Sequence, residues 1–126
     1  MRILLDTHIF LWSINDDPKL SKKGRSIIMD AEETYVSSAS IWEAVIKIKF
    51  GKLNIPIEKL AKSIKESGFL ELPITTDHTV AIASLPDYHR DPFDRILIAQ
   101  ALCEPLRLVT ADKLLTQYSD LVDLVL

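Results

Sequence analysis

The stretch RILLDTHIFLWSI, residues 2–14, contains a strand, an acid and a helix in direct succession. The segment RILL is a short apolar run, typical of a strand buried on both faces of a parallel sheet. Asp6 ends the run, and Ile9 and Trp12 then share one face of a helix that we predict over residues 7–14. The stretch therefore predicts a strand and a helix that meet at a carboxylate.

Strands and helices are predicted to alternate along the rest of the chain. Apolar and β-branched runs predict strands at 2–5, 34–38, 70–74, 106–110 and 121–126. Periodicity, caps and turn residues predict helices at 7–14, 22–33, 39–53, 56–69, 75–85, 92–103 and 111–118. We expect the helix at 39–53 to start with a capping box of Ser40 and Glu43 and to stop at Gly51. This alternation predicts an α/β fold, with a mainly parallel sheet and helices on both faces.

Composition narrows the class of protein. The chain has 126 residues, of which 48% are hydrophobic, which is enough for the core of a single domain over residues 1–126. The apolar runs are too short to cross a membrane, so we expect a cytoplasmic protein with no membrane contact. A lone cysteine, Cys103, excludes an internal disulfide, and we interpret it as a small buried residue of a helix.

The net charge of −3 argues against a nucleic-acid partner if the charges are spread evenly. The chain has 18 acidic residues against 15 lysines and arginines. If four of the acids surround one cation, 14 acids remain against 15 basic residues, which leaves a net charge of +1. The overall charge therefore does not exclude a nucleic acid.

A later helix start carries two aspartates three residues apart. In HRDPFDRILIAQAL, residues 89–102, Asp91 and Asp94 stand on either side of a proline before a long apolar run. Pro92 suits the first helical position, so we predict Asp91 as the N-cap and Asp94 in the first turn. Negative charge is favourable there, so both aspartates could serve the helix start alone.

Four acids share one expected place in such a sheet. Ligand groups gather outside the carboxyl ends of parallel strands, near the starts of the following helices. The acids with that place are Asp6, Glu43, Asp94 and Asp112. Each alone could be an ordinary cap or turn residue. Together they would repel, by about 4 kcal/mol for two carboxylates about 4 Å apart at an effective dielectric constant of about 20.

A bound cation would remove this repulsion. Oxygen ligands without a nearby cysteine or a histidine pair suit Mg²⁺ or Mn²⁺ rather than zinc. The natural chemistry of such a site is hydrolysis of a phosphodiester by a metal-activated water. Two alternatives remain open. One is a Mg²⁺-dependent phosphotransfer or phosphatase-like domain, although that phosphatase pattern needs an aspartate where His8 stands. The other is a non-catalytic interaction module whose acids are all caps.

A set of motifs, in order along the chain, resembles those of PIN-domain ribonucleases, and specifically VapC-type toxins of toxin–antitoxin pairs. They are LLDTHIFLW (4–12), VSSASIWEAVIK (36–47), GKL (51–53), LPI (72–74), HRDPFDRILIAQAL (89–102) and LVTAD (108–112). The resemblance implies a three-layer α/β/α sandwich with a mainly parallel sheet of about five strands. It also implies an acidic pocket that holds Mg²⁺ or Mn²⁺.

The resemblance assigns roles to individual residues. The family's catalytic and metal-binding acids fall on Asp6, Glu43, Asp94 and Asp112. Thr110 falls on the hydroxyl residue that accompanies the last acid, where it would orient a carboxylate or a water. Asp91, Arg95 and His8 are auxiliary candidates on the residues alone. Asp91 would be a cap near the pocket, and Arg95 a phosphate contact, a balancing charge or an ordinary surface ion pair. His8 would be an RNA or water contact, or a structural or solvated residue.

The resemblance further implies an activity and partners. The activity would be endonucleolytic cleavage of RNA, with tRNA, rRNA or mRNA as substrate. The partners would be a second copy in a homodimer and a cognate antitoxin protein whose C-terminal segment covers the pocket. Trp12 and Trp42 are expected to pack in the core or in the dimer interface. We predict no role for His78 and His89.

Overall fold

The computed structural model describes residues 1–126 and contains a five-stranded sheet in the order β3-β2-β1-β4-β5. The strands are β1 (Arg2–Leu5), β2 (Glu33–Ser37), β3 (Leu70–Leu72), β4 (Arg107–Thr110) and β5 (Val122–Leu124). The α-helices are α1 (Thr7–Ile14), α2 (Lys22–Asp30), α3 (Ser38–Lys49), α4 (Ile57–Glu66), α5 (Thr76–Ala81) and α6 (Pro92–Cys103). Two 3₁₀ helices follow α5 and β4, at η1 (Ile82–Ser84) and η2 (Lys113–Gln117). All neighbouring strands pair in parallel, so the predicted parallel sheet is confirmed.

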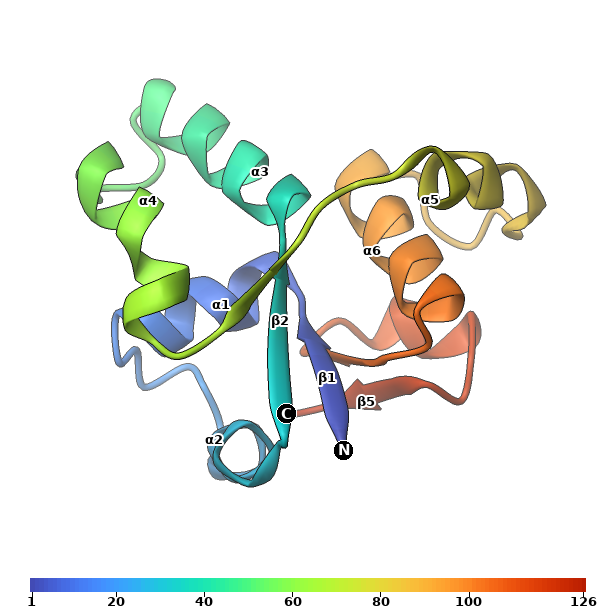
Figure 1. The fold of residues 1–126 in the computed structure, drawn as a ribbon, viewed down its shortest axis with the longest axis horizontal. Coiled ribbons are helices and arrows are strands. Elements are labelled where there is room, and N and C mark those ends of the chain that lie inside the picture. The colour runs from blue at the N-terminus through green and yellow to red at the C-terminus, as the bar shows by residue number, and fades with distance from the viewer.

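Helices cover both faces of the sheet, as Figure 1 shows for α1, α3 and α4 on one side and α6 on the other. Successive residues of a strand point to opposite faces. Ile3 and Leu5 of β1 accordingly join a core that includes residues of α1, α3 and α4, whereas Leu4 joins a core with α6 and η2. Both cores contain fully buried leucine and isoleucine side chains. The predicted three-layer sandwich is therefore confirmed.

The start of α3 differs from the expected capping box. Ser37 caps this helix, because its Oγ accepts a hydrogen bond of 3.0 Å from the backbone N–H of Ala39. Ser40 lies fully buried inside the helix, and its Oγ accepts a 3.0 Å hydrogen bond from Thr7 Oγ1 of α1. The predicted capping box of Ser40 and Glu43 is therefore wrong. The hydroxyl group of Ser40 instead links α3 to α1.

The predicted end of α3 at Gly51 is confirmed. The helix ends at Lys49, and Gly51 has a φ of 72°, a left-handed conformation that glycine adopts without strain.

Two further predictions differ from the structure. Cys103, the last residue of α6, is exposed, so the prediction that it is buried is wrong. The predicted helix at 111–118 is a 3₁₀ helix over Lys113–Gln117. No helix combines the length and the apolar content that crossing a membrane requires.

Two leucines of α6 allow the sheet packing to be tested within one helix. Leu97 is fully buried against the sheet, whereas Leu102 is 42% exposed. We expect Leu97→Ala to lower the free energy of unfolding by about 3 kcal/mol, because it removes buried methyl groups and leaves a cavity. Leu102→Ala makes the same chemical change and should cost less than about 1 kcal/mol. Urea unfolding followed by circular dichroism measures both, and equal losses would contradict the burial described above.

Candidate functional site

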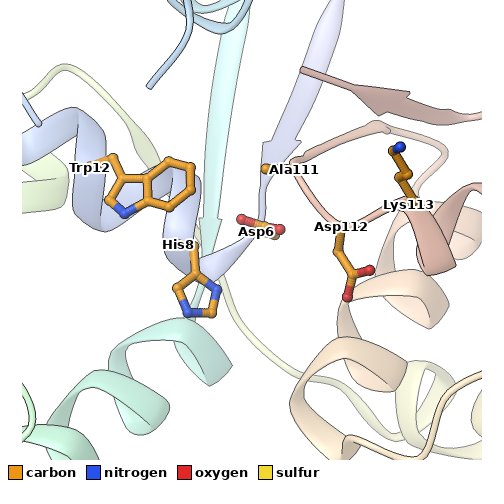
Figure 2. Close-up of a pocket in the computed structure, with 6 residues that line it drawn as sticks. All are labelled: Asp6, His8, Trp12, Ala111, Asp112 and Lys113. Carbon is orange, nitrogen blue, oxygen red and sulfur yellow. The ribbon is translucent and has the colours of Figure 1, made fainter. Parts of the chain in front are cut away.

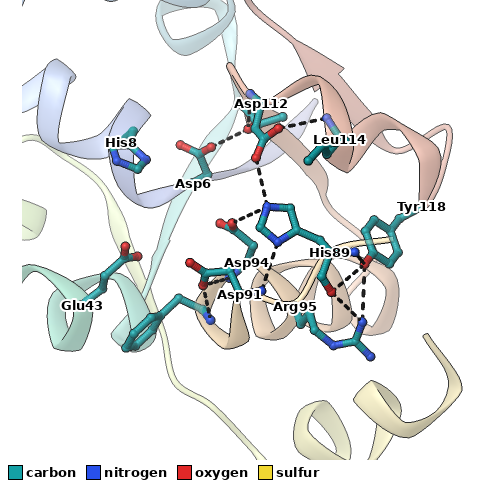
Figure 3. Close-up of polar contacts among 12 residues, drawn as sticks. Asp6, His8, Glu43, His89, Asp91, Asp94, Arg95, Asp112, Leu114 and Tyr118 are labelled. Atoms are coloured by element: carbon teal, nitrogen blue, oxygen red, sulfur yellow. Dashed lines mark hydrogen bonds and ion pairs between the residues drawn. The ribbon is translucent and has the colours of Figure 1, made fainter. Parts of the chain in front are cut away.

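The carboxyl ends of β1 and β4, the start of α6 and the second turn of α3 bring acidic side chains to one edge of the sheet. These side chains are Asp6, Glu43, Asp94 and Asp112, which we call the acidic site. Glu43 therefore lies one turn further along α3 than the expected helix start. Figure 3 shows their carboxylates around a common space. A parallel sheet has this effect because the carboxyl ends of all its strands lie at the same edge.

Asp6 is the most buried member of the acidic site, with 4% of its surface exposed. Its Oδ1 caps α1 by accepting a 2.8 Å hydrogen bond from the backbone N–H of Ile9. Its Oδ2 accepts a 2.5 Å hydrogen bond from Thr110 Oγ1. Burial raises the pKa of Asp6, although the hydrogen bonds from Thr110 and Ile9 oppose that rise.

Thr110 also positions Asp112. Its Oγ1 accepts a 3.0 Å hydrogen bond from the backbone N–H of Asp112 while donating to Asp6. Asp112 in turn caps η2, because its Oδ1 accepts a 2.9 Å hydrogen bond from the backbone N–H of Leu114. One buried hydroxyl group therefore connects the ends of β1 and β4.

Asp94 lies in the first turn of α6, as predicted, and Asp91 is the cap of that helix. Asp91 Oδ1 accepts hydrogen bonds of 2.8 Å and 3.2 Å from the backbone N–H groups of Phe93 and Asp94. Burial raises the pKa of Asp94 to about 7. The negative charges of Asp91, Asp6 and Glu43 add to this rise in the pKa of Asp94, and His89 opposes it.

Glu43 lies on α3, with its side chain 14% exposed. Lys47, one turn further along the helix, places its Nζ 3.4 Å from Glu43 Oε2. The same Nζ lies 3.3 Å from Nε2 of His8 on α1. Lys47 thus brings a positive charge to the edge of the acidic site, and His8 lies beside it.

An open hollow adjoins the acidic site (Figure 2). It has a volume of about 410 Å³ and is lined by Asp6, His8, Trp12, Ala111, Asp112 and Lys113.

The two tryptophans near the acidic site differ in burial. Trp12 is partly buried against the core, which agrees with its expected packing role. Trp42 is 61% exposed, and its ring centre lies 5.1 Å from that of Phe93 in an edge-to-face contact, so of its two expected places the core is excluded.

The donor set of this site fits a hard divalent cation. Ligand atoms of His89, Asp94 and Asp112 lie within 4.8 Å of one another. Asp6 and Glu43 lie outside this group of three, although their charges add to the rise in the pKa of Asp94. Crowded carboxylates with few hydrogen-bond donors suit Mg²⁺ or Mn²⁺, which bind oxygen ligands.

Comparison with known proteins identifies the family. The PIN domain profile matches residues 3–121. The chain belongs to the PIN domain family. A curated relative, ribonuclease VapC22 of Mycobacterium tuberculosis, is 27% identical to this PIN domain over 123 residues, which cover 92% of this chain and 91% of the relative.

Solved structures agree with the fold of this PIN domain. One is a chain of VapBC2 from Rickettsia felis, in a structure bound to a DNA fragment from the VapBC2 promoter. It superposes with a TM-score of 0.73 at 16% identity, and the match covers 99% of this chain and 99% of that chain. A toxin–antitoxin complex from Klebsiella pneumoniae gives a TM-score of 0.67 at 17% identity, with 96% of this chain and 95% of that chain covered. The resemblance inferred from the sequence motifs is therefore confirmed.

His89 of the PIN domain has no predicted role, yet it lies at the centre of the site (Figure 3). Its Nε2 lies 3.3 Å from Oδ2 of Asp112 and 3.3 Å from Oδ2 of Asp94. The only feature of the sequence that pointed to His89 was its position two residues before Asp91. No second potential metal ligand stands at a characteristic spacing from it.

Arg95 of the PIN domain turns away from the acids and holds the loop that carries His89. Its Nη1 donates hydrogen bonds of 3.0 Å and 3.1 Å to the backbone oxygens of Pro86 and His89. Tyr118 assists, because its hydroxyl oxygen accepts a 2.8 Å hydrogen bond from the backbone N–H of His89. No motif in the sequence pointed to Tyr118.

The raised pKa of Asp94, caused first by burial and then by neighbouring negative charges, predicts a pH-dependent stability of the PIN domain without a bound ion. The pKa of Asp94 is about 7 in the folded protein against an ordinary value of 3.8, so the folded state retains a proton that the unfolded chain releases. This contribution to the free energy of unfolding is full below the ordinary value and falls as the pH rises through about 7. We therefore expect Asp94→Asn to stabilise the protein in EDTA at about pH 8, by about 1 to 2 kcal/mol after allowance for solvent screening.

Thermal unfolding from about pH 4 to about pH 8 measures this effect. Asp30→Asn is the matched control, because Asp30 is exposed at the end of α2, before β2 begins. The gain from Asp94→Asn should grow with pH, whereas the control should stay flat. A gain that shrinks with rising pH would contradict the raised pKa of Asp94.

Proposed function

We propose that this PIN domain is a metal-dependent endoribonuclease and the toxin of a toxin–antitoxin pair. The observation that carries the proposal is the convergence of four carboxylates at one edge of the sheet, beside an open hollow. Burial and mutual repulsion raise the pKa of Asp94 to about 7, which a bound cation would reverse. Similarity to a relative that is named a ribonuclease supports RNA as the substrate.

The residues of the acidic site would hold Mg²⁺ or Mn²⁺ through their carboxylate oxygens. When bound, such an ion supplies a Lewis acid for the attacking water and for the phosphate oxygens. Thr110 would keep the Asp6 carboxylate in place through its 2.5 Å hydrogen bond. Lys47 and Lys113, at the rim of the acidic site and of the hollow, would offer positive charge to the phosphates of RNA.

Cleavage of purified RNA tests this function. With Mg²⁺ or Mn²⁺, we expect the wild type to cut tRNA, rRNA or mRNA into discrete fragments, and EDTA to abolish the cutting. Asp94→Asn should lower the cleavage rate by at least about 100-fold, because it removes a charged ligand. The exposed Asp30→Asn should leave the rate unchanged.

The alternatives make different predictions in this assay. A non-catalytic module would leave every RNA intact and gain no stability from the ions. A phosphatase-like domain would release phosphate from a phosphomonoester and spare the RNA. Cleavage that persists in Asp94→Asn or in EDTA would also overturn the proposal.

An antitoxin protein is the proposed inhibitory partner. The fold matches two solved toxin–antitoxin assemblies closely enough to support this role. A C-terminal antitoxin segment with a basic or aromatic residue could lie over the acidic site, where it would replace the cation as the positive partner. RNA and antitoxin would both meet the protein in the cytoplasm.

A homodimer is the proposed assembly, and an apolar surface near the acidic site supports it. Trp42 and Val80 are 61% and 65% exposed. Trp42 also lines a hollow of about 230 Å³, together with Ile74, Thr79, Ile82, Pro92, Phe93 and Ile96. Exposed aromatic residues around an apolar hollow are typical of protein interfaces, and a second copy of the chain would cover this one.

Size-exclusion chromatography with light scattering tests the dimer. We expect Trp42→Lys to convert a dimer into a monomer, because it places a charge in the covered apolar patch. Phe50→Lys is the control, since Phe50 is 73% exposed at the other end of α3. A wild type that elutes as a monomer at all concentrations, or a dimer that Trp42→Lys leaves intact, would contradict this assembly.

A further inference from the structure

His89 occupies the space between two carboxylates of the acidic site. Its Nε2 lies 3.3 Å from Oδ2 of Asp112 and 3.3 Å from Oδ2 of Asp94. The His89 side chain is only 18% exposed, so water does little to replace this contact. These two oxygens also belong to the cluster that offers ligand atoms to a cation.

The hydrogen bond at the other ring nitrogen of His89, Nδ1, determines which nitrogen carries the proton. Nδ1 accepts a 3.1 Å hydrogen bond from the backbone N–H of Asp91, so Nδ1 has no proton of its own. The proton of the neutral ring is therefore on Nε2, the nitrogen that faces the acids. A histidine nitrogen must be free of its proton to bind a metal ion. In this arrangement His89 is a hydrogen-bond donor to the acids and is not a metal ligand.

The backbone around His89 is held from two directions. Tyr118 accepts a 2.8 Å hydrogen bond from the backbone N–H of His89, and Arg95 donates a 3.1 Å hydrogen bond to the backbone oxygen. Arg95 also donates to the backbone oxygen of Pro86 at 3.0 Å. The ring therefore keeps its place beside the acids because the loop that carries it is fixed.

We propose that His89 is a positioning residue that competes with the metal ion for the carboxylates of Asp94 and Asp112. In the ion-free protein, Nε2–H keeps these two acids together and relieves part of their repulsion. The same oxygens are needed by the cation, so the Nε2–H contacts are given up when the ion binds. The inference rests on the proposed metal-dependent function and adds to it a residue that weakens the binding of the ion.

Two amide substitutions separate the two hydrogen bonds of the His89 ring. In His89→Asn, the amide oxygen replaces Nδ1 and can still accept from the N–H of Asp91, but no donor reaches the acids. In His89→Gln, the longer amide places its NH₂ group where Nε2 was, so the donor to the acids is kept and the acceptor for Asp91 is lost. Thermal unfolding in EDTA verifies that both variants are folded.

The measurement is the affinity for Mn²⁺ alone, from the electron paramagnetic resonance signal of the free ion. We expect His89→Asn to bind Mn²⁺ about tenfold more tightly than the wild type, equivalent to about 1.4 kcal/mol, because the competing donor is gone. His89→Gln should stay within about twofold of the wild type, because it restores the donor. Binding by His89→Asn that is equal to or weaker than that of the wild type would overturn the inference.

The failure of this inference can be told apart from the failure of the proposed function. If Asp94→Asn loses Mn²⁺ binding but His89→Asn behaves as the wild type, only the role of His89 is overturned. If the wild type does not bind Mn²⁺, or Asp94→Asn binds it unchanged, the proposed metal site fails and the inference fails with it.

Nitrogen-15 NMR of the imidazole rings gives an independent readout with Mg²⁺, which is diamagnetic. We expect Nε2 of His89 to remain protonated after Mg²⁺ is added, with a changed chemical shift because its acceptors are lost. The signals of His89 are assigned by their absence in His89→Asn. An unprotonated Nε2 in the Mg²⁺ form would identify His89 as a ligand and overturn the inference.

Discussion

The Asp6 carboxylate lies almost fully buried where β1 meets α1, and the geometry of the acidic site depends on how it is held. Burial alone would favour the protonated form, and it raises the pKa of Asp6. The hydrogen bonds from the backbone of Ile9 and from Thr110 act in the opposite direction by stabilising the charge. Since Thr110 lies at the end of β4, the pairing of β1 with β4 is what brings this donor to Asp6.

Capping a helix and belonging to the acidic site are compatible roles for one carboxylate. Asp6 and Asp112 each cap the helix that follows their strand, and each lines the same hollow. At the start of α6 the two roles belong to two residues, because Asp91 caps the helix while Asp94 faces the other acids. A carboxylate has two oxygens, so one can satisfy backbone N–H groups while the other faces the site. The cap therefore fixes the direction of the functional oxygen.

A second group of residues determines the shape of the site without belonging to it. Arg95 and Tyr118 fix the loop before α6, and this loop places His89 between two acids. At the C-terminal end of α6, the buried His78 places its Nε2 2.6 Å from Oε2 of Glu104, which ties α5 to this end of α6. These contacts join α6 to other segments at both of its ends.

The sequence by itself determined the parallel sheet, the helices on both faces and the cap at Asp91, because apolar runs and cap residues act over a few neighbouring positions. It also identified the four acids, although their convergence remained a prediction. Tertiary packing decided that Ser37 rather than Ser40 begins α3, because Ser40 pairs with Thr7 of another helix. Packing likewise decided the positions of His89 and Arg95, whose partners come from the residues that flank η2 and from the loop before α6. No local sequence pattern predicts such contacts, because they form only after distant segments of the chain have come together.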